Sequence, residues 1–278
     1  MTAKSAIQTV WIFDVDGVIT DPSEKKITEL QILEEINNKL EKGEPVILNT
    51  GRSISWLIEK VINLLNDHVT DQNVLKNFFA VGEKGGAWTE FNDSGDLIEK
   101  KDENISVPEK LKDEIRNLIK TIYSESMFYD ESKLTMISTE MIDNHPIDDF
   151  HHRQKELTAE LNNLLRNENL NKKFKVDPTT IATDVENKFV GKHFAIQRIL
   201  SWLNSKNVKP QKYITFGDTF KSDIPMAEEL HSQNLPVEFV YVGKENIDTS
   251  RFPFPVYQTK AKFGKGTAEF LKSANQKP

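Results

Sequence analysis

The chain has 278 residues and a formal net charge of −7 at pH 7, with 36 Lys and Arg against 43 Asp and Glu, and it has no Cys. This length allows one large or two modest domains, the lack of Cys excludes disulfides, thiol catalysis and Cys-ligated zinc, and the acidic balance argues against a general nucleic-acid binder. No apolar run reaches the roughly 18 to 20 residues of a membrane span and no secretory pattern is present, so we expect a soluble, cytoplasmic protein that binds no membrane.

The first predicted element is a strand over 10–16, which ends in two carboxylates, Asp14 and Asp16, followed by Gly17 for a tight turn. A buried parallel strand delivers such side chains to the carboxyl edge of its sheet. Two like charges so close together require a cation, and oxygen ligands without Cys or His favour Mg²⁺ over Zn²⁺. The alternative is a polar turn after a core strand, because Asp and Gly are common in turns. A helix over 27–42, apolar on one face, comes next.

The second strand, over 45–50, stops at a hydroxyl, a glycine and a cation. The Thr50 hydroxyl and the backbone N–H groups of Gly51 and Arg52 can donate to phosphoryl oxygens at the start of a helix. The alternative is an ordinary helix N-cap, for which Ser53 is the better candidate.

The middle of the chain, over 103–186, has an α/β pattern of its own and no motif of the metal-binding type. Its periodicity predicts helices over 111–122 and 157–165 and strands over 133–138, 174–176 and 181–183. His151 and His152 lie beside two acids there, but adjacent side chains on one helix point in different directions. We therefore expect no metal site at these histidines.

Lys192 opens a predicted helix over 191–205. A lysine at a helix start opposes the macrodipole, so it calls for a nearby anion, either a carboxylate or a phosphate. A strand over 213–218 then runs into a loop that carries two further acids, Asp218 and Asp223. These acids complete the ligand set for a hard metal ion.

Taken in order, the four segments are DxD over 14–16, a strand ending in Thr50, then Lys192, then GDxxxxD over 217–223. This order resembles that of the haloacid dehalogenase superfamily of phosphohydrolases. The resemblance spans the chain from the first of these motifs to the last. The intervening strand and helix signals agree with it throughout.

By this resemblance, Asp14 is the nucleophile that attacks phosphorus and forms an aspartyl phosphate. Asp16 is the general acid for the leaving oxygen and then the base for water. Thr50 and Lys192 hold the phosphoryl oxygens. A carboxylate attacks a dianionic phosphate poorly unless the repulsion is cancelled, which agrees independently with a cation and a lysine at this place.

The resemblance also implies a Mg²⁺ cofactor held by Asp14, the backbone carbonyl of Asp16, and Asp218, with Asp223 binding the metal or its waters. Two features depart from the family pattern. Val18 stands where members often have Thr or Ser, which leaves the subclass open. The acidic loop reads Lys-Ser-Asp where many capped sugar phosphatases read Asn-Asp, so it is open whether Asp223 touches the metal.

The expected fold class is α/β, with a Rossmann-like doubly wound parallel sheet as the core and an inserted α+β cap domain. The core takes residues 1–102 and 187–278, and the cap takes 103–186. The predicted core strands lie over 10–16, 45–50, 78–83, 213–218 and 237–243, and the core helices over 27–42, 53–66, 191–205 and 222–231. A turn over 263–266 opens a final helix.

An insertion between the second and third motifs resembles the larger, type-two α/β cap found in many sugar phosphatases. Such a cap closes over the site, excludes water and selects the leaving group. Tyr129, Lys133 and Arg153 are candidates for substrate contact, with ordinary surface positions as the alternative.

Together these features predict a Mg²⁺-dependent phosphatase for a small phosphorylated metabolite, with a sugar phosphate as the first candidate. One alternative is a phosphohexomutase-type phosphotransferase, which returns the phosphoryl group to sugar instead of water. The other is a non-catalytic, phosphate-binding regulatory protein of the same fold. The expected partner is the metabolite, and the expected state is a monomer or a homodimer.

Overall fold

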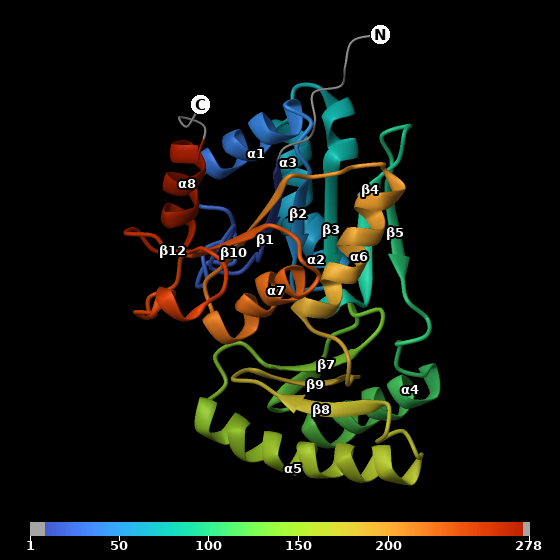
Figure 1. The fold of residues 1–278 in the computed structure, drawn as a ribbon. Helices are drawn as coiled ribbons and strands as arrows, with labels where there is room; N and C mark the ends of the chain where they lie inside the picture. Colours follow the sequence, from blue (N-terminus) through green and yellow to red (C-terminus); the bar gives the residue numbers. More distant parts are fainter. Residues whose placement is uncertain (1–8, 275–278) are drawn as a thin grey trace. The chain divides into compact units, whose positions relative to one another are not determined.

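The structure is a computed structural model that describes residues 9–274, and its contacts divide the chain into two compact units (Figure 1). The core unit combines the chain up to Lys100 with the chain from Gly191 onward, and the inserted unit is Lys101–Val190. Among the helices of the described residues, none is both long and apolar enough to cross a membrane.

The core unit is built on an eight-stranded sheet with the order β12-β11-β10-β1-β2-β3-β4-β5. Its strands are β1 (Thr9–Phe13), β2 (Val46–Asn49), β3 (Phe78–Gly82), β4 (Ala87–Phe91), β5 (Leu97–Lys101), β10 (Lys212–Gly217), β11 (Val237–Tyr241) and β12 (Val256–Gln258). Pairing is parallel from β12 to β3 and antiparallel between β3 and β4. The strand order reverses at β1, and ligands of such sheets bind at the carboxyl ends of the strands beside this point.

Helices cover both faces of this sheet because successive strand residues point to opposite sides. Val10 and Ile12 of β1 join the apolar cluster that α6 (Lys192–Ser205) and α7 (Phe220–Ser232) complete. Phe13 instead stacks on Phe216 of β10 at 4.5 Å between ring centroids, and Phe216 contacts Phe270 of α8 (Phe263–Ala274). The helices of this unit are α1 (Gln31–Glu41), α2 (Ile54–Leu57), the π-helical turn η1 (Ile58–Ile62), α3 (Asn63–His68), α6 (Lys192–Ser205), α7 (Phe220–Ser232) and α8 (Phe263–Ala274).

The inserted unit is a four-stranded sheet with the order β6-β7-β9-β8 and antiparallel pairing throughout. Its elements are α4 (Glu109–Leu118), η4 (Ile119–Tyr123), β6 (Met127–Tyr129), β7 (Ile137–Met141), α5 (Ile147–Asn167), β8 (Phe174–Pro178) and β9 (Ala182–Asn187). Side chains from the helices and strands, among them Ile115, Leu157, Phe174 and Val185, form one apolar core. This unit therefore has a hydrophobic core of its own.

The predicted fold class is confirmed, with local corrections. The sheet carries an antiparallel extension, β4 and β5, and a short edge strand, β12, which the sequence did not predict. The first helix was expected from residue 27 but begins at Gln31, with Leu30 as its N-cap. A turn precedes it, in which the Asp21 N–H donates to the Lys26 carbonyl at 2.8 Å. The turn expected over 263–266 is the first turn of α8, where a Cβ on Gly266 would come within 2.5 Å of a backbone oxygen.

The inserted unit also differs in detail from the predicted elements. The strand expected over 133–138 begins at Ile137, and β6 was missed because it has only three residues. The helix expected over 157–165 extends over Ile147–Asn167, because its first two turns are mostly polar and carry few apolar markers.

Candidate active site

The predicted site residues converge at the carboxyl edge of three neighbouring strands. Asp14 and Asp16 follow β1, Thr50 follows β2, and Asp218 follows β10, while Lys192 begins α6. The backbone N–H of Asp14 donates to the carbonyl oxygen of Phe216, near the end of the adjacent strand β10, at 3.1 Å. The parallel register thus fixes these side chains at one edge.

Lys192 pairs with two buried carboxylates. Its Nζ lies 2.7 Å from Asp14 Oδ1 and also contacts Asp223 Oδ1. The exposed fraction is 5% for Asp14 and 0% for Asp223. Buried charges are costly unless they are paired, so this lysine compensates the two acids. The prediction that a lysine at this helix start requires an anion is confirmed by both pairs.

Asp14, Asp218 and Asp223 each offer one carboxylate oxygen, and these three oxygens lie within 4.8 Å of one another. Oxygen donors at such spacing can surround one hard cation, and carboxylates are the ligands that Mg²⁺ accepts from proteins. The residues present therefore fit the metal that the sequence predicts. The side chain of Asp16 is outside this cluster, so a contact between its backbone carbonyl and the metal stays a prediction.

Two glycines allow the acidic loops to approach so closely. Gly17 has φ of +73°, and a Cβ there would lie 2.2 Å from Asp218 Oδ2. A Cβ on Gly217 would lie 2.2 Å from the Cβ of Asp223. Glycine is needed at both places, because any side chain would push a carboxylate out of the cluster.

We expect Gly17→Ala to lower the free energy of unfolding by about 1–3 kcal/mol and to weaken Mg²⁺ binding, because the new Cβ displaces Asp218. Thermal unfolding with and without MgCl₂ measures both effects. Gly43→Ala is the matched control, since Gly43 has φ of +77° with nothing within 4 Å of its Cβ position. Equal stability losses and equal Mg²⁺ shifts in the two variants would contradict this account.

Burial raises the pKa of two acids in this cluster. It raises the pKa of Asp14 to about 8, opposed by Lys192 and reinforced by Asp223. It raises the pKa of Asp218 to about 6, again with repulsion from Asp223. Without a metal, Asp14 thus keeps a proton at neutral pH and Asp218 gains one below about pH 6, and a bound cation must displace these protons.

Stabilisation by Mg²⁺ should therefore grow as pH rises from 6 to 8, the range of the two raised pKa values. A carboxyl group whose pKa is raised by folding binds its proton more tightly in the metal-free folded protein than in the unfolded chain. The stability of the metal-free protein therefore falls as pH rises toward the folded-state pKa. Thermal unfolding at several pH values, with MgCl₂ or NaCl at matched ionic strength, checks this. Asp218→Asn should flatten the pH dependence, and a Mg²⁺ shift independent of pH in the wild type would refute the prediction.

The carboxylate of Asp16 faces Arg52. The guanidinium Nε and Nη2 donate to its two oxygens at 3.0 and 2.9 Å. The sequence assigned Arg52, by its backbone N–H, to a phosphoryl oxygen, but in this structure that N–H donates to Thr50 Oγ1 at 3.2 Å. Ser53 caps α2 by accepting from the Trp56 N–H, also at 3.2 Å, as predicted. Thr50 is therefore not needed as a helix cap.

A loop that the sequence analysis missed supports these positions. Glu83 and Lys84 follow β3 with φ of 50° and 55°, uncommon for residues with side chains. The Glu83 N–H donates to the Arg52 carbonyl at 2.9 Å, and Lys84 bonds through its backbone to both Thr50 and Gly191. This loop ties the second motif to the start of α6. The signal in the sequence that could have found this loop is the glycine at the end of β3, Gly82, since β10 also ends in a glycine, Gly217.

Asn49, the last residue of β2, also acts on Lys192. Its Nδ2 donates to the Lys192 carbonyl at 3.0 Å, and the side chain is fully buried. This hydrogen bond fixes the first turn of α6 and therefore the position of the Lys192 Cα, from which the side chain extends. The sequence predicted Asn49 only as a residue of the second strand.

The two neighbouring histidines of α5 have separate partners. His151 Nε2 lies 3.0 Å from the Thr180 carbonyl oxygen, and His152 Nε2 lies 3.5 Å from Glu156 Oε1. The absence of a metal site at these histidines stays a prediction. Of the candidates for substrate contact, Tyr129 lies under the guanidinium of Arg116.

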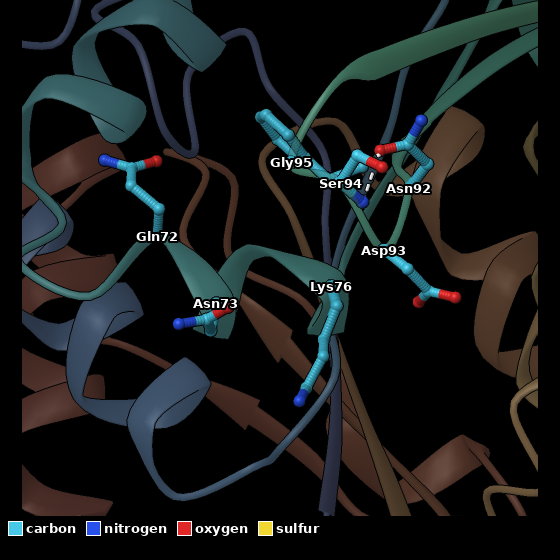
Figure 2. Close-up of a pocket in the computed structure, with 8 residues that line it drawn as sticks. Gln72, Asn73, Lys76, Asn92, Asp93, Ser94 and Gly95 are labelled. Atoms are coloured by element: carbon cyan, nitrogen blue, oxygen red, sulfur yellow. Dashed lines mark hydrogen bonds between the residues drawn. The ribbon is translucent and has the colours of Figure 1, made fainter.

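A cavity of about 210 Å³ lies elsewhere in the core unit, between the short helix η2 (Gln72–Asn77) and the turn after β4 (Figure 2). Because β4 runs antiparallel to β3, this turn is at the amino edge of the parallel strands, away from the acidic cluster. Most of the residues that line it are polar, and Figure 2 shows Asn92 accepting a hydrogen bond from the Ser94 N–H within the turn. None of the predicted site residues lines this cavity.

No protein-family model matches the sequence, and no curated protein matches it. Solved structures do match. The C-terminal domain of C. albicans trehalose-6-phosphate phosphatase has a TM-score of 0.62 at 17% identity, covering 96% of this chain and 92% of that one. A Thermoplasma acidophilum protein has a TM-score of 0.59 at 18% identity, covering 98% and 100%. Plasmodium falciparum IMP-nucleotidase has a TM-score of 0.57 at 14% identity, covering 97% and 61%.

These likenesses cover nearly the whole chain and show its fold. The chain has the α/β fold of haloacid dehalogenase type, with the mostly parallel sheet that its motifs predicted. The identities are too low to transfer an activity from the fold alone.

Proposed function

We propose that the chain is a Mg²⁺-dependent phosphatase that hydrolyses a small phosphorylated metabolite through an aspartyl-phosphate intermediate. The observation that carries this proposal is the buried group of Asp14, Lys192, Asp218 and Asp223 at the carboxyl edge beside β1. A nucleophile, a cation-binding set and a fixed positive charge are the elements that phosphoryl transfer requires. The names of similar structures, trehalose-6-phosphate phosphatase and IMP-nucleotidase, support a phosphatase.

In the first step, an Asp14 oxygen forms a bond to phosphorus while the bond from phosphorus to the leaving oxygen breaks. Asp16 gives its proton to that leaving oxygen. Thr50, the Gly51 N–H and Lys192 bind the phosphoryl oxygens, with Arg52 at the edge of this group. Mg²⁺ held by Asp14, Asp218 and Asp223 would reduce the repulsion between the negative phosphoryl group and the negative nucleophile.

In the second step, water attacks the phosphorus of the aspartyl phosphate. Asp16 takes a proton from that water, the bond from phosphorus to Asp14 breaks, and inorganic phosphate leaves. Asp14 thus returns to its carboxylate form and Asp16 to its protonated form. Positioning on a rigid sheet edge supplies much of the rate acceleration in such a transfer.

We further propose residues 103–186 as a cap domain that selects the substrate, and a sugar phosphate as that substrate. Solved structures named trehalose-6-phosphate phosphatase, among the similar ones, favour a sugar phosphate, and IMP-nucleotidase makes a nucleotide the competing class. Tyr129, Lys133 and Arg153 are retained as candidates for this contact. A cytoplasmic monomer or homodimer agrees with the sequence.

Phosphate release from a panel of esters tests the proposal. The panel holds monosaccharide phosphates, trehalose 6-phosphate, phosphoglycolate, nucleoside monophosphates and an aryl phosphate, each with MgCl₂ or EDTA. Release that requires Mg²⁺ is expected, with sugar phosphates preferred. Transfer of phosphate between positions on a sugar, without release, would support the mutase. Binding of phosphate esters without turnover would support the regulatory protein.

A further inference from the structure

The Arg52 guanidinium donates hydrogen bonds to both oxygens of the Asp16 carboxylate. Nε donates to Oδ2 at 3.0 Å and Nη2 donates to Oδ1 at 2.9 Å, so the ion pair is bidentate. A planar guanidinium that donates two hydrogen bonds fixes the direction of a carboxylate as well as its distance. A lysine ammonium, as a point charge, would fix the distance alone.

Arg52 is itself anchored along its whole length. Its guanidinium lies 4.8 Å from the centroid of the Trp56 ring. Its carbonyl accepts from the Glu83 N–H at 2.9 Å, and its own N–H donates to Thr50 Oγ1 at 3.2 Å. Backbone and side chain are both held, so the direction imposed on Asp16 is set by the core unit before any ligand arrives.

The pair is too exposed to serve mainly for stability. The side chains of Arg52 and Asp16 are 23% and 35% exposed. Ion pairs with this access to water typically contribute only about 0–1 kcal/mol. The ion pair adds little to stability, although Arg52 is held by three further contacts. These contacts are better explained by a role of Arg52 in orienting the Asp16 side chain.

We propose that Arg52 is a positioning residue, which holds the Asp16 carboxyl group in the direction needed to give a proton to the leaving oxygen and then to take one from water. The proposal rests on the proposed function, and it differs from the assignment of Arg52 to substrate binding. The two roles are separable, because loss of a substrate contact raises KM, whereas loss of orientation lowers kcat.

Steady-state kinetics of Arg52→Lys is the first test. The expected result is a kcat lower by about 10²-fold, with KM little changed. In an Asp16→Asn background the same substitution should cause no further loss, because Arg52 acts through Asp16. Arg116→Lys is the control, since Arg116 makes the same bidentate contact with Glu131 and lies over Tyr129. The control should leave kcat unchanged.

A raised KM at unchanged kcat, or losses that add in the double variant, would overturn the proposal in favour of substrate contact. The second test needs no activity. In ¹H–¹⁵N spectra of the full chain, the Arg52 Nε–H signal, assigned by its absence in Arg52→Lys, should shift and exchange faster in Asp16→Asn.

An Nε–H signal that Asp16→Asn leaves unchanged would overturn the pairing itself. No phosphate release from any ester, together with a signal that responds to Asp16→Asn, would overturn the proposed function. That result would also refute the positioning role of Arg52 in catalysis, while the ion pair between Arg52 and Asp16 would remain supported. The two failures are therefore distinguishable.

Discussion

Asp14→Asn is expected to abolish phosphate release, by at least about 10³-fold, because the amide cannot form the aspartyl phosphate. The substitution keeps the side-chain size and leaves Lys192 paired with Asp223, so the fold should persist. It also removes one of three carboxylates from the metal set, so the stabilisation by Mg²⁺ should fall. Phosphate release and thermal unfolding with and without MgCl₂ measure the two effects.

Asp143→Asn provides the matched control for Asp14→Asn. Asp143 is exposed in the inserted unit and outside the acidic cluster, so the same chemical change there should leave release and the Mg²⁺ shift unchanged. Mass spectrometry of the wild type quenched in acid during turnover should find phosphate on the peptide that contains Asp14. Wild-type rates in Asp14→Asn would exclude Asp14 as the nucleophile.

The carboxyl-edge cluster was predictable because one physical rule orders it. Parallel strands end at a common edge, so acids and hydroxyls that directly follow strands must meet there, however far apart they lie in sequence. Asp14 and Asp218 obey this rule, and Asp223 lies in the first turn of α7, the helix that follows β10. Lys192 was marked by its conflict with the helix dipole. The pattern of the sequence alone therefore sufficed to bring these groups together.

Other features depend on contacts that no local pattern encodes. The partner of Arg52 was missed because a cation at a helix start suits a phosphate and a carboxylate equally well. Asn49 was missed because its role is one hydrogen bond to the backbone of Lys192. Strands β5 and β12 escaped prediction because β5 is largely exposed and β12 has three residues, so neither shows a clear apolar alternation.

Lys192→Met should destabilise the metal-free protein by about 3–5 kcal/mol, because it leaves Asp14 and Asp223 buried without their cation. The loss should be smaller at pH 6 than at pH 8, since the pKa of Asp14, already raised to about 8 by burial, rises further and the acid becomes neutral. Phosphate release should also fall by about 10²-fold or more, because the positive charge at the phosphoryl oxygens is gone. Chemical denaturation at the two pH values measures the stability loss.

Mg²⁺ should restore part of the stability of Lys192→Met, because a cation bound by Asp14, Asp218 and Asp223 replaces the missing charge at the same place. The increase in melting temperature on adding MgCl₂ should therefore exceed that of the wild type. Lys112→Met is the control, which shows whether Mg²⁺ rescues any variant that has lost a buried lysine. Lys112 is 5% exposed and donates to the Leu134 carbonyl in the inserted unit, so its removal should destabilise without rescue by Mg²⁺. Equal rescue of both variants, or of neither, would mean that Lys192 does not act as the counter-charge of the metal site.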